Sequence, residues 1–461
     1  MRYRSYALFI SVICLLNGVA TGQDHIVKKV DEFIRAEMES QHIPGVSLAV
    51  IKDGKPVIVK GYGLANVEHN VPVKPETVFQ SGSVAKQFTA TAVMMLVENG
   101  KVDLDKPIGT YLGDVPDTWA GITVRHLLSH TGGMTDYPDD FDYRRDYTED
   151  ELLKQAKEIP LAFKAGDRWM YSNLGYVVLG ILIHKVSGKF YGDLLQERVF
   201  KPLGMTSARI INEADIIPNR AAGYRLVKGQ LKNQAWVSPS INTTADGSLY
   251  LTVYDMIKWD EALSAGKLLR RSSFDEMCKP VKLNNGKIHP YGFGWAVREV
   301  NGKTVVEHGG AWQGFKAHIA RFPENRITVV LFANLIQTNQ YAIAHGVAEI
   351  VEPELKPKPV VDADAAFSAR TKELLQAVLE NKADLSRFTP NVQREITIGR
   401  DRIYDFVGSM GALLNFSLVE RESAAGVDRY RYQLVYTGMN VFLELEVNKD
   451  GKISSFALQP E

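Results

Sequence analysis

The placement of strand-like segments constrains the fold of this 461-residue chain most, because they lie at both ends of a long helical middle. Near the N-terminus, the apolar runs 45–51 and 56–61 flank Asp53-Gly54, and Asp-Gly between apolar runs is a strong hairpin signal. The residue pattern predicts the remaining strands over 292–300, 303–308, 316–322 and 326–332. Strands in these positions indicate an antiparallel sheet closed by distant segments, with helices on its faces, rather than a βαβ repeat.

The middle of the chain has the residue pattern and the end signals of helices. A helix is expected from Ser83 to Glu98, because Gly100 follows as a stop signal. Another is expected over 173–187, ended by Gly188. Further helices are predicted over 30–39, 148–157 and 252–264. The predicted fold class is therefore α/β (α+β).

A change in composition over 351–364, which is rich in Pro, Lys and Val, indicates a linker. Beyond it, one helix is predicted over 365–382, followed by strands over 403–407, 413–420, 429–437, 440–447 and 452–458. These elements predict a separate α+β module of about 95 residues, a normal size for a domain. The chain would thus consist of a large domain over 23–350 and a small one over 365–461.

The first 22 residues have the features of a secretory signal peptide. Arg2 and Arg4 precede a short apolar run, and small residues at Ala20 and Gly22 allow cleavage near Gly22. A membrane anchor is the alternative, but the apolar run is shorter than the roughly 20 residues that a spanning helix needs. We therefore expect a secreted or periplasmic protein that has no transmembrane helix after cleavage.

Charge and cysteine content exclude several classes of protein. Lys and Arg together number 54, as do Asp and Glu, so the formal net charge is zero and the basic excess typical of nucleic-acid-binding proteins is missing. Cys14 and Cys278 are the two cysteines, too few for a cysteine-rich zinc site or a multi-disulfide framework. Removal of the signal peptide would leave Cys278 alone.

The sequence Ser-x-x-Lys occurs twice, and one copy has companions. Ser83 begins a predicted helix, and Lys86 lies about one turn further on the same face, where its amino group can hold or take the serine proton. The alternative is a serine that caps the helix beside a solvated lysine. The second copy, Ser264 to Lys267, lies at the end of a predicted helix without partner motifs, and we interpret it as chance.

Two further segments carry groups suited to acyl transfer. Tyr171 and Asn173 open a predicted helix, and a tyrosine whose pKa is lowered by cations can act as general base for a serine. His308-Gly309-Gly310 ends a predicted strand, where two glycines allow a substrate to approach the backbone closely. The ordinary alternatives are a half-buried tyrosine followed by a helix cap, and a tight turn.

In this order along one chain, these segments resemble the serine β-lactamase and penicillin-binding-protein family, specifically its class C-like branch of penicillin-binding proteins, esterases and peptidases. The resemblance covers residues 25–350. The segments that carry it are 43–46, 61–63, 77–86, 122–133, 171–176, 202–205 and 291–295. It implies a β-lactamase/transpeptidase-like fold, in which an antiparallel sheet flanked by helices is joined by an all-helical subdomain.

The resemblance also implies roles for four of the residues named above. Ser83 would be the acylated nucleophile, Lys86 its proton partner, and Tyr171 the base that passes a proton to the leaving group. Asn173 would contact the substrate amide and help to hold Lys86 in place.

The third segment would complete the site, but it departs from the family pattern. His308, Gly309 and Gly310 would bind substrate, and the N–H groups of Ser83 and Ala311 would form the oxyanion hole. True β-lactamases of this class have Lys-Thr-Gly here. Lysine is a fixed cation for a substrate carboxylate, whereas histidine has an ordinary pKa of about 6.5 and is mostly neutral at pH 7. This difference favours an esterase or peptidase, and it predicts a KM that changes as His308 titrates.

His126 and His130 have the spacing of a helical metal-binding pair. No glutamate follows His126 as in zinc proteases, and the sequence shows no third ligand. The pair lies in a segment that the resemblance explains as scaffold beside the site. We therefore expect neither a metal nor a cofactor.

Together, these patterns predict an exported serine hydrolase that acts on an amide or ester through a Ser83 acyl-enzyme. The partner would be a small molecule or peptide, namely a D-amino-acid peptide, a peptidoglycan fragment from the cell wall or a small ester, and no nucleic acid. The alternatives are a penicillin-recognising or scaffold protein with weak turnover, a carboxypeptidase and a true β-lactamase. The C-terminal module weakly resembles NTF2-like or lipocalin-like modules, and it could bind a ligand, mediate dimerisation or cover the site.

Overall fold

The computed structural model describes residues 24–138, 140–300, 302–356, 358, 360–397, 412–424, 426–436 and 440–460. The main boundary between two compact units falls between Val351 and Glu352. The predicted signal peptide, residues 1–22, lies outside the described residues, as does the strand predicted over 403–407. In the described part of the chain, no helix is both long enough and apolar enough to cross a membrane.

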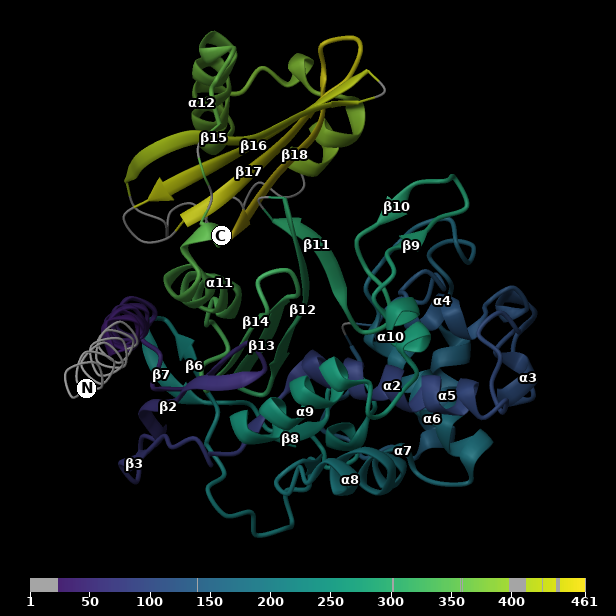
Figure 1. The fold of residues 1–461 in the computed structure, drawn as a ribbon. Coiled ribbons are helices and arrows are strands. Elements are labelled where there is room, and N and C mark those ends of the chain that lie inside the picture. Colours follow the sequence, from purple (N-terminus) through teal and green to yellow (C-terminus); the bar gives the residue numbers. More distant parts are fainter. Residues whose placement is uncertain are drawn as a thin grey trace, which may run out of the picture. The chain divides into compact units, whose positions relative to one another are not determined.

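The larger unit is built on a seven-stranded sheet (Figure 1). Its strands, in spatial order, are β11 (Ala296–Val300), β12 (Lys303–Trp312), β13 (Phe315–Phe322), β14 (Ile327–Ala333), β1 (Gly45–Lys52), β2 (Lys55–Asn66) and β3 (Val71–Pro72). The predicted β1–β2 hairpin is confirmed, and its turn residues Asp53 and Gly54 have φ of 52° and 74°. β1 pairs antiparallel with β14, so that Val46 lies opposite Ala333. The predicted closure of the sheet by distant segments is therefore confirmed.

Helices cover both faces of this sheet. Every residue of β14 is buried, which requires a packing partner on each side. Both α9 (Val253–Ala265) and α11 (Gln340–Val351) contact β14. The position of α9 was predicted, but α11 was not. Its Gly346 disfavours a helix locally, yet a Cβ there would lie 2.4 Å from Phe33 Cζ, so that packing against the N-terminal helix over 24–41 selects glycine.

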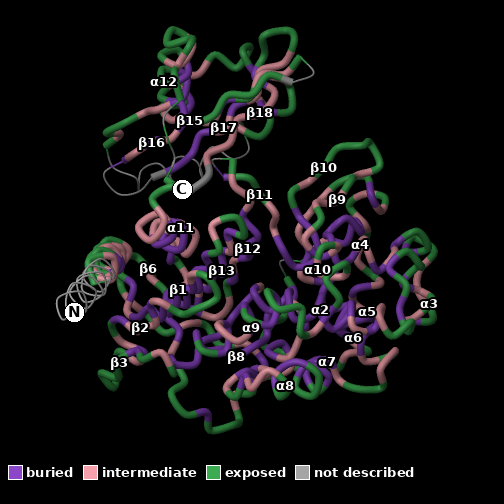
Figure 2. Tube along the Cα trace, viewed as in Figure 1, coloured by how far each residue is buried: buried purple, intermediate pink, exposed green. Residues whose placement is uncertain are grey.

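The helical region of this unit packs around two buried helices, α2 (Lys86–Glu98) and α6 (Asn173–Ser187), which contact each other. Figure 2 shows buried residues running through both. Gly100 and Gly188 follow them with φ of 69° and 71°, as the stop signals predict. The other helices are α3 (Gly109–Leu112), α4 (Val124–Leu128), α5 (Glu149–Glu158), α7 (Tyr191–Leu195), α8 (Lys201–Leu203) and α10 (Arg271–Met277).

A short three-stranded sheet brings the start of α2 next to a distant loop. Its order is β4 (Phe79–Gln80), β8 (Leu249–Leu251) and β5 (Arg209–Ile210). Directly after β4, the Ser81 N–H donates to Leu249 O at 2.9 Å. This pairing fixes the residues before α2 against the loop that precedes β8. Two small hairpins complete the unit, β6 (Tyr224–Val227) with β7 (Gln230–Asn233) and β9 (Val281–Lys282) with β10 (Ile288–His289).

The smaller unit consists of a four-stranded antiparallel sheet and a helix that packs on it. The strands are β15 (Leu413–Ala424), β16 (Val427–Tyr436), β17 (Asn440–Val447) and β18 (Ile453–Pro460), in that spatial order. Helix α12 (Ala365–Leu379) contributes Leu374 and Leu375 to a core that also contains Tyr432 and Leu443. The predicted small α+β fold at the C-terminal end is therefore confirmed.

Candidate active site

Ser83 lies in a short 3-10 turn, η1 (Gly82–Ala85), that leads directly into α2. The N-cap of this turn is Ser81, so the alternative in which Ser83 is an ordinary helix cap does not hold. Gly82 has a φ of 50°, and a Cβ there would lie 2.4 Å from Ala311 N. Glycine is needed at this position for both the backbone conformation and the close approach of β12.

The amino group of Lys86 is fully buried and is held by three acceptors. Its Nζ lies 3.2 Å from Ser83 Oγ, 2.7 Å from Asn173 Oδ1 and 2.6 Å from the backbone oxygen of Asp246. A buried ammonium is stable only when its N–H groups are paired, and three acceptors match three N–H groups. The alternative of a solvated lysine is therefore excluded, and the structure brings Lys86, Ser83 and Asn173 together.

Asn173 is fixed by an acid that the sequence did not reveal. Its Nδ2 donates to Asp136 Oδ2 at 2.9 Å, and the backbone N–H groups of Asn173 and Leu174 donate to Asp136 Oδ1. A carboxylate is favourable here because it faces the N-terminus of α6. Asp136 lies shortly after the family-like segment 122–133, but nothing in its spacing from Asn173 indicates that the two meet.

Tyr171, just before α6, packs in a cluster of aromatic rings. Ring centroids of His130, His308 and Tyr291 lie 4.3, 6.2 and 6.5 Å from its own. Lys86 Nζ lies 4.9 Å from the Tyr171 ring centroid. The Tyr171 hydroxyl is buried and has no hydrogen-bond partner among the residues that the structure describes. It is therefore free to exchange a proton with a group that enters the site.

Strand β12 passes directly beside the Ser83 turn because Gly310 has no side chain. A Cβ at Gly310 would lie 2.0 Å from Ser81 O and 3.0 Å from Ser83 N. A Cβ at Gly309 would instead lie 3.1 Å from Nε2 of Gln340, the first residue of α11, on the other face of the sheet. Gly310 thus permits β12 to approach the turn that carries Ser83. This approach places the exposed residue Ala311 beside that turn.

His308 is buried, with 6% of its surface exposed. Its Nε2 lies 2.8 Å from Tyr291 Oη, and its Nδ1 lies 2.6 Å from Gly309 O. Burial, reinforced by the positive charge of Lys86, lowers the pKa of His308 to about 3. The expectation that KM follows a His308 titration near the ordinary pKa is therefore wrong, because the ring stays neutral throughout the physiological range.

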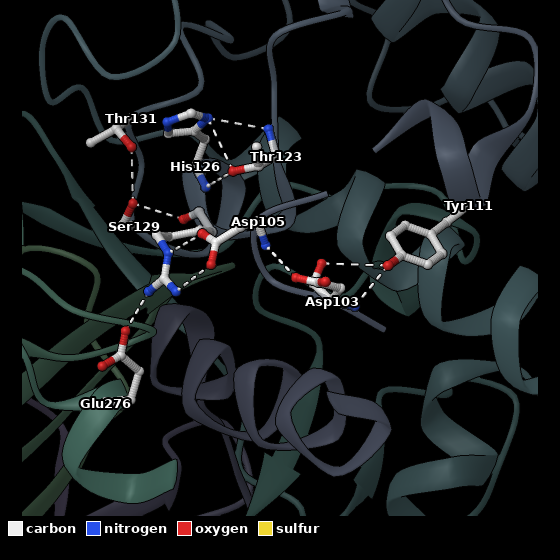
Figure 3. Close-up of polar contacts among 9 residues, drawn as sticks. Asp103, Asp105, Tyr111, Thr123, His126, Ser129, Thr131 and Glu276 are labelled. Carbon is white, nitrogen blue, oxygen red and sulfur yellow. Dashed lines mark hydrogen bonds and ion pairs between the residues drawn. The ribbon is translucent and has the colours of Figure 1, made fainter. Parts of the chain in front are cut away.

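The segment around α4 is anchored by polar contacts on several sides (Figure 3). The His126 N–H donates to Thr123 Oγ1 at 3.3 Å, and the Thr123 N–H donates to His126 Nδ1 at 3.1 Å, so the two residues form a capping box. Arg125 pairs with Asp105 at 2.6 Å and also with Glu276. His126 is therefore occupied in capping α4.

Among the described residues, Glu307, His318 and His345 form the one cluster with the composition of a metal site. The Nε2 atoms of His318 and His345 lie 3.1 and 2.7 Å from Glu307 Oε2, which are hydrogen-bond distances. Arg298 Nε lies 3.7 Å from the other carboxylate oxygen. Because the guanidinium of Arg298 already lies beside the Glu307 carboxylate, a divalent cation would add a second positive charge next to a single negative one. We therefore interpret the cluster as a hydrogen-bonded ion network.

Residues 30–350 match the protein-family model described as Beta-lactamase, and the chain belongs to this family. Penicillin-binding protein 4* of Bacillus subtilis (strain 168) is 26% identical over 361 residues, which cover 74% of this chain and 79% of that protein. A D-aminopeptidase of Gluconobacter oxydans (strain 621H) is 28% identical over 327 residues, which cover 68% of this chain and 60% of that protein.

A solved structure extends the similarity of fold over most of the chain. The octameric penicillin-binding protein homologue from Pyrococcus abyssi matches with a TM-score of 0.65 and 24% sequence identity, over 94% of this chain and 98% of that one. The predicted family and fold class are confirmed. Family membership, together with the D-aminopeptidase relative, also confirms that the chain is a serine hydrolase of the β-lactamase-related type.

Proposed function

We propose that this protein hydrolyses an amide or ester through an acyl-enzyme on Ser83. The observation that carries the proposal is the buried amino group of Lys86, 3.2 Å from the Ser83 hydroxyl. In this mechanism, Ser83 Oγ bonds to the substrate carbonyl carbon and loses its proton, and the leaving amine or alcohol departs with a proton. Water then attacks the acyl-enzyme and releases the acid.

In the proposed mechanism, Lys86 is a fixed cation and Tyr171 is the base. Because three acceptors face the Lys86 N–H groups, no lone pair on its nitrogen is directed at Ser83. In its deprotonated form, with the hydroxyl proton released to solvent, Tyr171 can take the serine proton and return it to the leaving group. The nearby Lys86 charge stabilises the negative charge that the Tyr171 oxygen carries before it takes this proton.

The backbone N–H groups of Ser83 and Ala311 are the proposed oxyanion hole. Gly82 and Gly310 support this role, since both lack the side chain that would separate β12 from the Ser83 turn. Loss of one such donor typically lowers turnover by about 10²–10³-fold. In this proposal, His308, Gly309 and Gly310 contribute by positioning strand β12, which carries the Ala311 N–H.

The charges around Ser83 favour a substrate without a carboxylate next to the reacting bond. Neutral His308 offers no cation where related β-lactamases have lysine, and Asp136 adds a negative charge beside Asn173. We therefore propose a D-aminopeptidase-like, amidase-like or esterase activity on a D-amino-acid peptide, a peptidoglycan fragment or a small ester. The similarity to a D-aminopeptidase supports this choice.

Penicillin recognition with weak turnover is a second candidate, favoured by the similarity to penicillin-binding protein 4*. Three substrates separate the candidates: p-nitrophenyl acetate, D-alanine p-nitroanilide and a fluorescent penicillin. In Ser83→Ala we expect ester and amide turnover to fall by about 10³-fold or more. The matched control Ser264→Ala, in the second Ser-x-x-Lys copy, should leave turnover unchanged. Undiminished turnover in Ser83→Ala would refute the proposal, and penicillin labelling without ester or amide turnover would support the second candidate.

We also propose that residues 1–22 direct export and are removed. Residues 365–461 would form an accessory module, which a linker over 351–364 joins to a hydrolase domain over 23–350. The arginines and the small residues of the first segment support export. Intact-mass measurement of the protein from an exporting host should give an N-terminus near Gln23. A mature protein that keeps Met1 would contradict the signal-peptide assignment.

A further inference from the structure

A chain of four hydrogen bonds links the Tyr171–Asn173 segment to strand β12. The Ser172 N–H donates to His130 Nδ1 at 3.2 Å, and His130 Nε2 lies 3.1 Å from Tyr291 Oη. Tyr291 Oη lies 2.8 Å from His308 Nε2, and His308 Nδ1 lies 2.6 Å from Gly309 O. We call these five residues the brace. It joins two motifs that are far apart in the sequence.

The two ends of the brace fix every proton within it. The Ser172 N–H can only donate, so His130 Nδ1 accepts and the His130 proton lies on Nε2. At the other end Gly309 O can only accept, so His308 carries its proton on Nδ1 and accepts on Nε2. Tyr291 therefore accepts from His130 and donates to His308. Each of the three side chains between these ends uses one donor and one acceptor, and a further proton on either imidazole ring would break a bond.

The surroundings keep both imidazole rings neutral. His130 and His308 are buried, and burial together with the Lys86 charge holds the pKa of each below its ordinary value. The other titratable groups that face the two rings are Tyr171, Tyr176, Tyr291, His289, Glu307 and His318. A neutral brace holds its arrangement of protons across the physiological pH range.

Two backbone features show why such a brace is needed. Gly309 and Gly310 pair with β13 on one edge of the strand, but glycine is the most flexible residue and adds no side-chain contact that would fix its peptide plane further. The His308 bond to Gly309 O fixes the plane that leads into Gly310 and Ala311. At the other end, His130 adopts a left-handed backbone with a φ of 59°, which a non-glycine residue keeps only where its surroundings enforce it.

We propose that His130 and Tyr291 are positioning residues for acyl transfer, which hold the Tyr171 ring and the Gly309–Ala311 strand at a fixed separation across Ser83. The His130 ring packs on one side of Tyr171, with centroids 4.3 Å apart. The proposal rests on the roles proposed above for Tyr171 and Ala311. It assigns His308 a role in positioning the strand, in place of recognising the charge of a substrate carboxylate.

Tyr291→Phe tests the brace because it removes one hydroxyl, and with it two of the four bonds, while keeping the ring. We expect kcat to fall by about 10–100-fold, with KM changed less, because Tyr171 and the strand that carries the Ala311 N–H lose their alignment. His308 also loses the hydroxyl that donates to its Nε2, so the pKa of His308 should rise and the acid limb of kcat should move to higher pH.

The matched control is Tyr191→Phe. Tyr191 is also buried, and its hydroxyl donates to Thr244 O at 2.8 Å, outside the brace. A merely structural role for Tyr291 predicts that both variants lose similar thermal stability and keep the wild-type kcat and pH profile. That result would overturn the proposal.

A second measurement does not depend on turnover. Nitrogen-15 NMR of the histidine side chains in the full-length protein should show His130 as the Nε2–H tautomer and His308 as the Nδ1–H tautomer. Neither ring should titrate between about pH 5 and 8. His130→Gln and His308→Gln assign the signals. A different tautomer, or a titration in this range, would refute the brace even if Ser83→Ala upholds the proposed hydrolase activity. Conversely, the expected tautomers would stand if that activity failed.

Discussion

The Ser-x-x-Lys sequence occurs twice in this chain, and the two copies occupy different environments. In the first, Lys86 is fully buried and its amino group faces Ser83 and two further acceptors. In the second, at the exposed end of α9, Lys267 pairs with Glu261 at 2.6 Å, and both side chains are about half exposed. Ser264 Oγ accepts from an arginine on β13 instead of from its own lysine.

The comparison teaches that the chemistry of the motif depends on what surrounds it. An ion pair in water is screened and contributes little, because solvent competes for both partners. Around Lys86 water is replaced by oriented acceptors, so the charge acts strongly on nearby atoms. The position of the acceptors on α6 and on the loop before β8 makes the first copy a site.

The largest effect that tests this difference is expected from replacing the two lysines by methionine. Lys86→Met removes the cation and leaves buried acceptors on Asn173 and Asp246 without a donor. We expect kcat/KM to fall by about 10²–10⁴-fold. The free energy of unfolding should fall by about 1–3 kcal/mol for each unpaired group. Lys267→Met should change stability by no more than about 0.5 kcal/mol and leave activity intact.

Ester hydrolysis measures the predicted difference in activity between the two variants, and urea denaturation measures the predicted difference in their free energy of unfolding. Equal losses of activity in Lys86→Met and Lys267→Met would show that burial does not distinguish the two copies.

A smaller effect is expected from the carboxylates that cap the helices near each copy. Asp136→Asn weakens the hold on Asn173 and should lower kcat/KM by about tenfold, because Asn173 positions Lys86. Asp255, which accepts from Thr252 Oγ1 at 2.8 Å, caps α9 and provides the control. Asp136→Asn and Asp255→Asn should each lower the free energy of unfolding by about 0.5–2 kcal/mol, but Asp255→Asn should leave activity unchanged. Steady-state kinetics and thermal melting of the two variants would contradict this view if both lost activity to the same degree.

The smallest effect is the pH dependence of stability that burial of the first copy brings. His130 and His308 have lowered pKa values in the folded protein, His308 at about 3, whereas unfolded histidine has a pKa of about 6.5. Between these values the unfolded state binds more protons, so stability rises with pH in this window and falls as pH drops below about 6.5. Each such histidine contributes a slope of up to about 1.4 kcal/mol per pH unit.

Urea denaturation between about pH 5 and 7.5 measures this slope, and His308→Asn should make it shallower. An unchanged slope in His308→Asn would show that this ring is not neutral in the fold.

Features that depend on local spacing could be predicted from the sequence. The β1–β2 hairpin follows from Asp53-Gly54 between apolar runs, and α6 follows from its periodic pattern with Gly188 behind it. Other features depend on partners that are distant in the sequence. α11 was missed because its Gly346 is explained only by Phe33, and Asp136 was missed because it meets Asn173 only in the folded chain.

The sequence by itself determined the family, the antiparallel sheet closed from both ends, and the placement of Ser83 and Lys86 about one turn apart. The family follows from the resemblance carried by the order of short motifs along the chain. The sheet and the Ser83–Lys86 spacing follow from hydrophobic pattern and helical spacing, which are properties of neighbouring residues. Only the tertiary structure decided which Ser-x-x-Lys copy is buried and that His308 is neutral. Both outcomes depend on desolvation and on hydrogen-bond partners from distant segments, and these exist only once the chain has folded.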